Sequence, residues 1–392
     1  MDDYVKVSVG DLGESYFRRD RTKEIEMIDA VIFDCDGVLI DVRESYNRAI
    51  SRTVSKIVEA VTKCRFPEDL ITDRMLFAFR RSGGFNNDWD LTYAILTFIL
   101  CNLPPKIRES IEKHLKMTKE GADPHEKLLD LMREAERDGL SLLDRTVIGK
   151  LIDDLFKFAG KLDSTGIDSV NKNLLIDESL ESFYEIIRDF LNYPGDVGES
   201  IIATLFEEVF CGSSLFREVY GLEPKFYRGR GLIENERLIV KPNVLDRLGR
   251  IIGGFRFGIS SGSGVRQAEY VLGNLLRMFN HKALVFKEDI DRAEREVGVR
   301  LWKPNPYPLL RSASALEPFR YALYVGDSME DLIMVDEARR TDKRFLFAGV
   351  YYYSSPREEA LKAFLEAGCD LILPSVNELP DVLEMIKGGF DF

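Results

Sequence analysis

Histidine and cysteine are scarce in this chain of 392 residues. With only three histidines, a histidine-based catalytic triad or a histidine-rich metal site is not expected. The five cysteines are scattered, odd in number and form no CxxC pair, so we expect no zinc site and a reducing compartment. These residues are His114, His125 and His281, and Cys35, Cys64, Cys101, Cys211 and Cys369.

The chain also lacks long apolar runs and an excess of positive charge. No run reaches the roughly 18–20 apolar residues that a membrane helix needs, and the N-terminal residues lack the basic stretch and apolar core of a signal peptide. The net charge of −13 argues against a nucleic-acid partner held through phosphate contacts. We therefore expect a cytoplasmic globular protein that binds neither nucleic acid nor a membrane.

The sequence does contain short apolar runs that alternate with helix-period segments such as 264–279 and 328–340. This alternation predicts an α/β fold, with a doubly wound parallel sheet and helices on both of its faces. In such a fold the ligand lies beyond the carboxyl ends of the strands. The expected strands are 28–33, 255–260, 283–286, 321–325, 345–350 and 370–373.

A second sequence pattern has apolar residues three and four apart with charges between them. This pattern predicts helices, and no strand pattern of comparable strength interrupts it. Among its segments are 44–61, 126–139, 147–162 and 176–191. The expected organisation is an N-terminal extension (1–27, with a possible edge strand at 4–9), an α/β core (28–44 and 244–392) and an inserted α-helical domain (45–243). Additional helices at about 104–190 would enlarge a lid or form a homodimer surface.

Reactive residue types follow four of the expected strands. Two carboxylates one residue apart at a strand end cost several kcal/mol to bury unless a metal, a cation or a reaction neutralises them. In chain order the residues are Asp34 and Asp36 (FDCDGV), Ser261 (SSGSG), Lys303 (WKPNP), and Asp327 and Asp331 (GDSMED). This order resembles the haloacid dehalogenase-like (HAD) superfamily, whose members are mostly phosphatases. The resemblance covers about 28–45 and 244–380 and includes all four family motifs.

The resemblance implies a role for each residue. Asp34 matches the nucleophile that attacks phosphorus and forms an aspartyl phosphate. Asp36 matches the acid that protonates the leaving alcohol and then takes a proton from the hydrolytic water. Alternate strand positions share a face, so both carboxylates reach one phosphoryl group. Lys303 offsets charge on Asp34 and on the phosphoryl oxygens. Relatives that cleave carbon–halogen bonds lack an acid at position 36, which favours a phosphate ester.

Several carboxylates that face a phosphate dianion repel it unless a divalent cation lies between them, and oxygen-only ligands suit Mg²⁺. We expect Asp34 and Asp327 to bind Mg²⁺ through their side chains and Asp36 through its backbone carbonyl. Asp331 fits three roles: a supporting contact, a ligand through water, or a helix cap.

The phosphoryl oxygens are expected to lie against Ser261, the amides of Gly262 and Ser263 at a helix start, and Lys303. Ser260 competes with Ser261 as the hydroxyl that holds them. Ser261 also fits a plain helix N-cap.

Helical insertions directly after the first motif are the C1-type cap of the superfamily's first subgroup. Within this cap, the stretch 82–95 is a dense polar and aromatic cluster before a helix. One interpretation is a capped helix start, with Asp88 or Asn87 as the N-cap and Trp89 packed inside. The other is a loop that contacts the substrate's leaving group through Asn86, Asn87, Asp88 and Trp89.

These observations predict a Mg²⁺-dependent phosphomonoesterase that acts on a small phosphorylated metabolite. A phosphomutase or phosphotransferase with the same nucleophile is the nearest alternative, and a cofactor requirement for a sugar phosphate would reveal it. A non-enzymatic scaffold that binds a protein through its cap helices is the alternative from another class.

Overall fold

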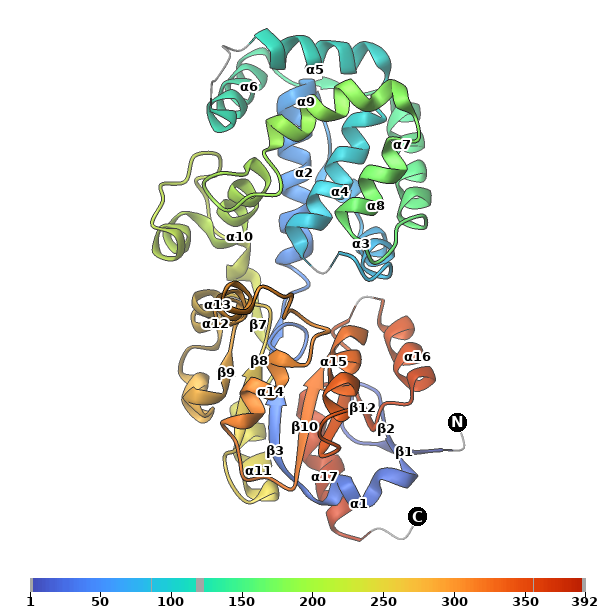
Figure 1. The fold of residues 1–392 in the computed structure, drawn as a ribbon, viewed down its shortest axis with the longest axis vertical. Coiled ribbons are helices and arrows are strands. Elements are labelled where there is room, and N and C mark those ends of the chain that lie inside the picture. Colours follow the sequence, from blue (N-terminus) through green and yellow to red (C-terminus); the bar gives the residue numbers. More distant parts are fainter. Residues whose placement is uncertain (1–2, 86, 118–122, 355, 390–392) are drawn as a thin grey trace. The chain divides into compact units, whose positions relative to one another are not determined.

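A computed structural model describes the structure of residues 3–85, 87–117, 123–354 and 356–389. The chain divides into two compact units (Figure 1). Unit 1 comprises Met1–Arg43 and Glu236–Phe392, and unit 2 comprises Glu44–Asn235. In sequence, unit 2 is therefore an insertion into unit 1.

Unit 1 is built on an eight-stranded sheet with the order β1-β2-β12-β11-β10-β3-β8-β9. The six strands from β12 to β9 are parallel, and all six were predicted. Their bounds are β3 Ile28–Phe33, β8 Phe257–Ser260, β9 Leu284–Val285, β10 Tyr321–Gly326, β11 Phe345–Val350 and β12 Leu371–Leu373. The protein is thus a mixed α/β protein with a mostly parallel sheet.

Both faces of this sheet are covered by helices. Successive strand residues point to opposite sides of the sheet, so each strand contributes side chains to both faces. Val31 and Phe33 of β3 join one apolar cluster, whereas Ala30 and Ile32 join another. Helices α1 (Thr22–Glu26), α11 (Pro242–Ile252), α12 (Val265–Leu272) and α17 (Leu379–Lys387) contribute to the first cluster. Helices α14 (Tyr307–Ser314), α15 (Met329–Arg339) and α16 (Arg357–Ala367) contribute to the second. Another helix, α13 (Lys287–Val297), follows β9 and buries Ile290 in a smaller cluster.

The N-terminal residues form a hairpin on the edge of the sheet. Strand β1 (Tyr4–Ser8) is the edge strand predicted at 4–9, and it pairs with β2 (Glu14–Arg18). Strand β2 pairs antiparallel with β12, where Tyr16 lies opposite Ile372. Phe17 of β2 is fully buried in the first apolar cluster. The hairpin is therefore part of the core of unit 1.

A second, two-stranded sheet stands where the chain leaves unit 1 and returns to it. Strand β4 (Ile40–Asp41) pairs antiparallel with β7 (Arg237–Leu238). The Ile239 amide continues the contact by donating to the Leu39 carbonyl at 2.8 Å. Residues 236–243 belong to unit 1, whereas the sequence analysis predicted them to lie in the helical insertion.

Unit 2 is helical, apart from two-residue strands β5 (Cys64–Arg65) and β6 (Ser141–Leu142). Helix α4 is buried almost continuously from Leu91 to Cys101, as the center of a helical unit should be. The α-helices among its described residues are α2 Tyr46–Thr62, α3 Asp73–Arg80, α4 Asp88–Cys101, α5 Pro105–Met117, α6 Pro124–Asp138, α7 Arg145–Ala159, α8 Ile167–Leu174, α9 Glu181–Leu191 and α10 Ile201–Tyr220. Helices α5 to α9 fill the range predicted to hold additional helices.

Candidate active site

Asp34 lies directly after the central strand β3. Its amide donates to the Val325 carbonyl of β10 at 2.9 Å, which extends the parallel pairing by one residue. The residue is 8% exposed, and its Oδ1 accepts the Cys35 amide at 2.7 Å. The strand pairing and this local bond fix the carboxylate at the carboxyl edge of the sheet.

A tight turn follows, and it requires glycine at position 37. The Cys35 carbonyl accepts the amides of the three residues from Val38 to Ile40. Gly37 has φ of 71°, and a Cβ built on it would lie 2.1 Å from Oδ2 of Asp327. The turn thus lets the backbone approach the carboxylate that follows β10.

Lys303 joins two of the predicted site carboxylates. Its Nζ lies 2.7 Å from Oδ2 of Asp34 and 2.8 Å from Oδ1 of Asp331. The Tyr324 hydroxyl accepts a third bond from it, at 2.8 Å. The lysine side chain is only 12% exposed, so these bonds form in a setting where charge is poorly screened.

Asp331 is fully buried, and both of its oxygens have partners. Oδ1 accepts from Lys303 and lies 3.1 Å from the Tyr324 hydroxyl. Oδ2 accepts the Ser328 amide at 3.2 Å and the Ser328 hydroxyl at 2.7 Å, which completes a capping box at the start of α15. The supporting role and the helix-cap role predicted for Asp331 therefore coexist in one carboxylate.

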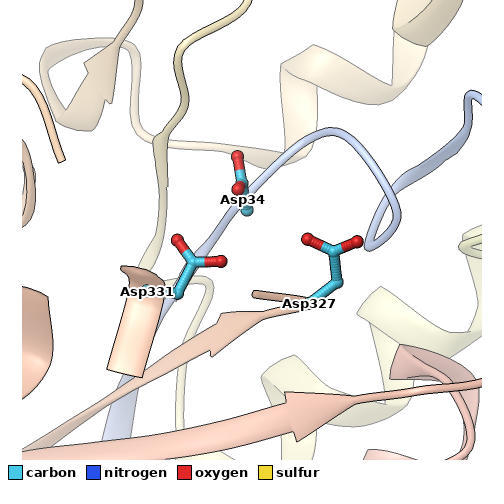
Figure 2. Close-up of side chains that lie close together, drawn as sticks. All are labelled: Asp34, Asp327 and Asp331. Atoms are coloured by element: carbon cyan, nitrogen blue, oxygen red, sulfur yellow. The ribbon is translucent and has the colours of Figure 1, made fainter. Parts of the chain in front are cut away.

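Asp34, Asp327 and Asp331 form a three-carboxylate cluster, shown in Figure 2. One oxygen from each can be chosen so that all three lie within 4.8 Å of one another. Burial and the charge of Asp331 raise the pKa of Asp34 against the opposing effect of Lys303. Burial, followed by the charges of Asp331 and Asp34, raises the pKa of Asp327 well above its ordinary value. Burial opposes the charge of Lys303, but Asp331 and Asp34 raise its pKa well above the ordinary value.

This charge balance suits a divalent cation. One lysine faces three carboxylates, so a negative excess remains when all three are ionised. Only oxygen atoms are offered, which is the donor set that Mg²⁺ prefers. The Asp331 carboxylate lies within hydrogen-bond distance of four donors, whereas the Asp34 carboxylate accepts from two, which leaves Asp34 more lone pairs for an ion.

The loop after β8 carries a chain of hydroxyl groups. The hydroxyls of Ser261 and Ser263 lie 3.0 Å apart, and that of Ser263 donates to Oδ2 of Asp36 at 2.8 Å. The Ser260 hydroxyl is buried and has no hydrogen-bond partner among the described residues. Of the two competing serines, Ser261 is the one whose hydroxyl joins these hydrogen-bonded groups. The hydrogen bonds connect the predicted phosphate loop with the predicted acid.

Gly262 lies between Ser261 and Ser263 and next to the Trp302 ring. A Cβ at Gly262 would lie 3.2 Å from the Trp302 ring. Trp302 directly precedes Lys303, so the lysine segment packs on the serine loop. The sequence did not predict this contact.

Tyr324 and Ser328 are also site residues that were not predicted. Ser328 carries a detectable signal, because a serine three residues before an aspartate fits a capping box. The signal at Tyr324 is weaker. It is a phenol at an inward position of a buried strand, and such a hydroxyl needs a partner.

The predicted substrate residues of unit 2 form a capped helix start. The Asn87 side chain accepts the Trp89 amide at 2.8 Å, and Asp88 pairs with Arg80 at 2.8 Å. The Trp89 indole donates to Glu207 of α10 at 3.1 Å. Asn86 lies outside the described residues. The N-cap interpretation is therefore confirmed for Asn87, whereas contact with a substrate stays a prediction.

Neither a family model nor a curated protein matches this chain. Two solved structures do match. The X-ray structure of Northeast Structural Genomics Consortium target ZR25 is 18% identical, with 92% of this chain and 99% of that chain covered and a TM-score of 0.61. Phosphatase Tt82 from Thermococcus thioreducens is 19% identical over 92% and 99% of the two chains, with a TM-score of 0.47. The likeness to ZR25 shows that the fold is shared.

Proposed function

We propose that this protein is a Mg²⁺-dependent phosphomonoesterase of the HAD-like superfamily, with unit 1 as its doubly wound core and unit 2 as a C1-type helical cap. The observation that carries the proposal is the cluster around Lys303. This lysine bonds to Asp34 and Asp331, and both of them share an oxygen cluster with Asp327. These four residues come from three separate motifs, and a shared site explains why they meet.

Asp34 is the nucleophile in this proposal. Its carboxylate attacks phosphorus, a bond forms between the two, and the bond from phosphorus to the ester oxygen breaks. Asp36 gives its proton to the departing alkoxide. Asp36 then takes a proton from water, which attacks the aspartyl phosphate, releases inorganic phosphate and restores Asp34. The Ser263 hydroxyl that donates to Asp36 supports this role, because it orients the acid.

Mg²⁺ would be held by the side chains of Asp34 and Asp327 and by the Asp36 carbonyl. When bound, it offsets the charge of the carboxylates and of the phosphoryl group. Asp331 fixes Lys303 and the start of α15. Ser261, the amides of Gly262 and Ser263, and the Lys303 charge would hold the phosphoryl oxygens.

The proposed substrate is a small phosphorylated metabolite, because a helical cap closes most readily over a small molecule. Asn87, Asp88 and Trp89 are the proposed contacts to its leaving group. A cytoplasmic location and a homodimer through the cap helices complete the proposal. No helix in the described part of the chain is long and apolar enough to cross a membrane.

The test is phosphate release from a panel of metabolite phosphates and p-nitrophenyl phosphate, with Mg²⁺ or with EDTA. We expect release that requires Mg²⁺ and falls to background in Asp34→Asn. Asp29→Asn is the matched control, because Asp29 is a buried aspartate at the opposite end of β3. It should retain release from the fraction that folds.

Failure of every ester, with folded protein and measured Mg²⁺ binding, would contradict the proposal. Release that appears only with an added sugar phosphate cofactor would instead identify a phosphomutase.

A further inference from the structure

Tyr324 is a buried tyrosine in the middle of the central sheet. It lies on β10, three residues before Asp327, and is 0% exposed. Its ring belongs to the second apolar cluster and stacks on Phe347, with ring centroids 6.4 Å apart. A phenylalanine would fill this apolar position equally well, so the hydroxyl needs its own explanation.

The hydroxyl meets three segments that carry the site. It accepts from Nζ of Lys303 at 2.8 Å. It lies 3.0 Å from the Ser260 carbonyl, at the end of β8, and 3.1 Å from Oδ1 of Asp331. Having one proton, it fully donates to only one of these acceptors at a time. Its acceptor role toward Lys303 is available in either case.

The hydrogen-bond capacity of Lys303 shows what this bond does. An ammonium group has three N–H donors, and Lys303 has three acceptors: Asp34, Asp331 and Tyr324. Two are carboxylates, which also attract the charge. Tyr324 is neutral, so it fixes the direction of the ammonium without neutralising it. Lysine has a flexible four-carbon stem, so a third acceptor further restricts where its ammonium group lies.

We propose that Tyr324 is a positioning residue that acts through Lys303. Its hydroxyl holds the ammonium where it bonds to the nucleophile Asp34 and where its charge acts on the phosphoryl oxygens. This inference rests on the proposed phosphatase function and adds a residue to its machinery.

The first experiment compares Tyr324→Phe with the wild type and with Tyr351→Phe. Tyr351 is the matched control, because it is 2% exposed and its hydroxyl donates to one backbone carbonyl, that of Glu14, at 2.8 Å. For Tyr324→Phe we expect kcat to fall about 10- to 100-fold, the range of one hydrogen bond to a charged group. KM should change less than about threefold, with Mg²⁺ affinity and melting temperature near wild type. Tyr351→Phe should keep kcat within about twofold.

The second experiment asks whether Tyr324 acts through the lysine. In Lys303→Met, an uncharged side chain of similar length, adding Tyr324→Phe should change kcat no further. Equal fold-losses of kcat from Tyr324→Phe in both backgrounds would overturn the proposal, because the hydroxyl would then act independently of Lys303. A Tyr324→Phe enzyme with wild-type kcat would overturn it too.

A third variant replaces Tyr324→Phe in these experiments if the Tyr324→Phe protein fails to fold. Tyr324→4-fluorophenylalanine keeps nearly the volume of tyrosine but removes the hydroxyl donor and leaves a weak acceptor. It should show the same loss of kcat, and wild-type kcat would overturn the proposal. A wild-type protein that releases no phosphate would overturn the proposed function instead, so the two failures are distinguishable.

Discussion

At the scale of the residue, three of the predicted carboxylates are tied to local structure as well as to the site. Asp331 caps α15 and holds Lys303. Asp36 accepts from a serine of the loop after β8. Asp327 lies against the turn at Gly37. Small backbone changes should therefore alter the site without removing a reactive group.

Gly37→Ala tests this at one position. The new Cβ would lie 2.1 Å from Oδ2 of Asp327, a distance that forces the carboxylate or the turn to move. We expect Mg²⁺ affinity, measured by isothermal titration calorimetry, to fall at least about tenfold, as mispositioned metal sites do.

Gly298→Ala is the control for that change. Gly298 has the same φ of 71°, but its Cβ would meet nothing within 4 Å. The two variants share the backbone strain and differ in the clash. Equal Mg²⁺ affinities in the two proteins would show that the Gly37 turn does not place Asp327.

At the scale of the element, the sheet joins segments from both ends of the chain. Strand β2 lies beside β12, and Phe17 from β2 is buried with residues of β3 and α17. Strand β12 would be an exposed edge without it. The N-terminal hairpin is therefore a stabilising element, although it carries no reactive residue.

Phe17→Ala should confirm this contribution. Removal of a fully buried aromatic ring costs about 3–5 kcal/mol of unfolding free energy, through lost burial and a residual cavity. Urea denaturation of Phe17→Ala and of Phe255→Ala would measure it. Phe255 is 53% exposed, so its variant should lose much less. A loss for Phe17→Ala below about 1 kcal/mol would mean that the hairpin is only loosely attached.

The sequence predicted the elements with strong periodic signals and missed those with weak ones. All six parallel strands are apolar runs bounded by polar residues, and such runs are recognisable. Helix α10 was not named, since its buried residues continue around it from Ile201 to Gly212 and give little periodicity. Two-residue strands such as β4 and β7 depend on pairing between distant segments, which periodicity does not report.

The site divides in the same way. Asp34, Lys303 and Asp327 were predictable as a group because each follows a parallel strand or its connection, and such ends share one edge. The Tyr324 hydroxyl was not predictable, because its partners come from β8, α15 and the Lys303 loop. Only the folded chain shows that these three meet.

At the scale of the whole molecule, the proposed metal site should make stability depend on pH. Without metal, the folded protein holds Asp34 and Asp327 at raised pKa values, with burial as the largest cause. In the unfolded chain aspartate titrates at about pH 4. The stability that protonation contributes is thus complete below about pH 4 and is lost as pH rises through the folded-state values.

In the proposed site Mg²⁺ would bind the ionised carboxylates, so it should reverse that loss of stability. We expect the increase in melting temperature caused by Mg²⁺ to be larger at about pH 8 than at about pH 5.5, where protons compete with the metal. Calorimetric scans with Mg²⁺ or EDTA at both pH values would measure it. Asp327→Asn should abolish most of the difference. A Mg²⁺ effect that is equal at both pH values, or larger at the lower one, would contradict the assignment of these carboxylates.

The antiparallel pair β4 and β7 has a consequence for the history of such a chain. Residues Glu44–Asn235 leave and re-enter unit 1 through two strands that are hydrogen-bonded to each other. For unit 1 this long insertion therefore resembles a hairpin loop, because the strand pair already holds its two ends together. Evolution is then free to lengthen, shorten or exchange the inserted segment in one recombination event while the sheet and its carboxylates persist. The inserted segment and the sheet that carries the carboxylates would thus be inherited as separable modules.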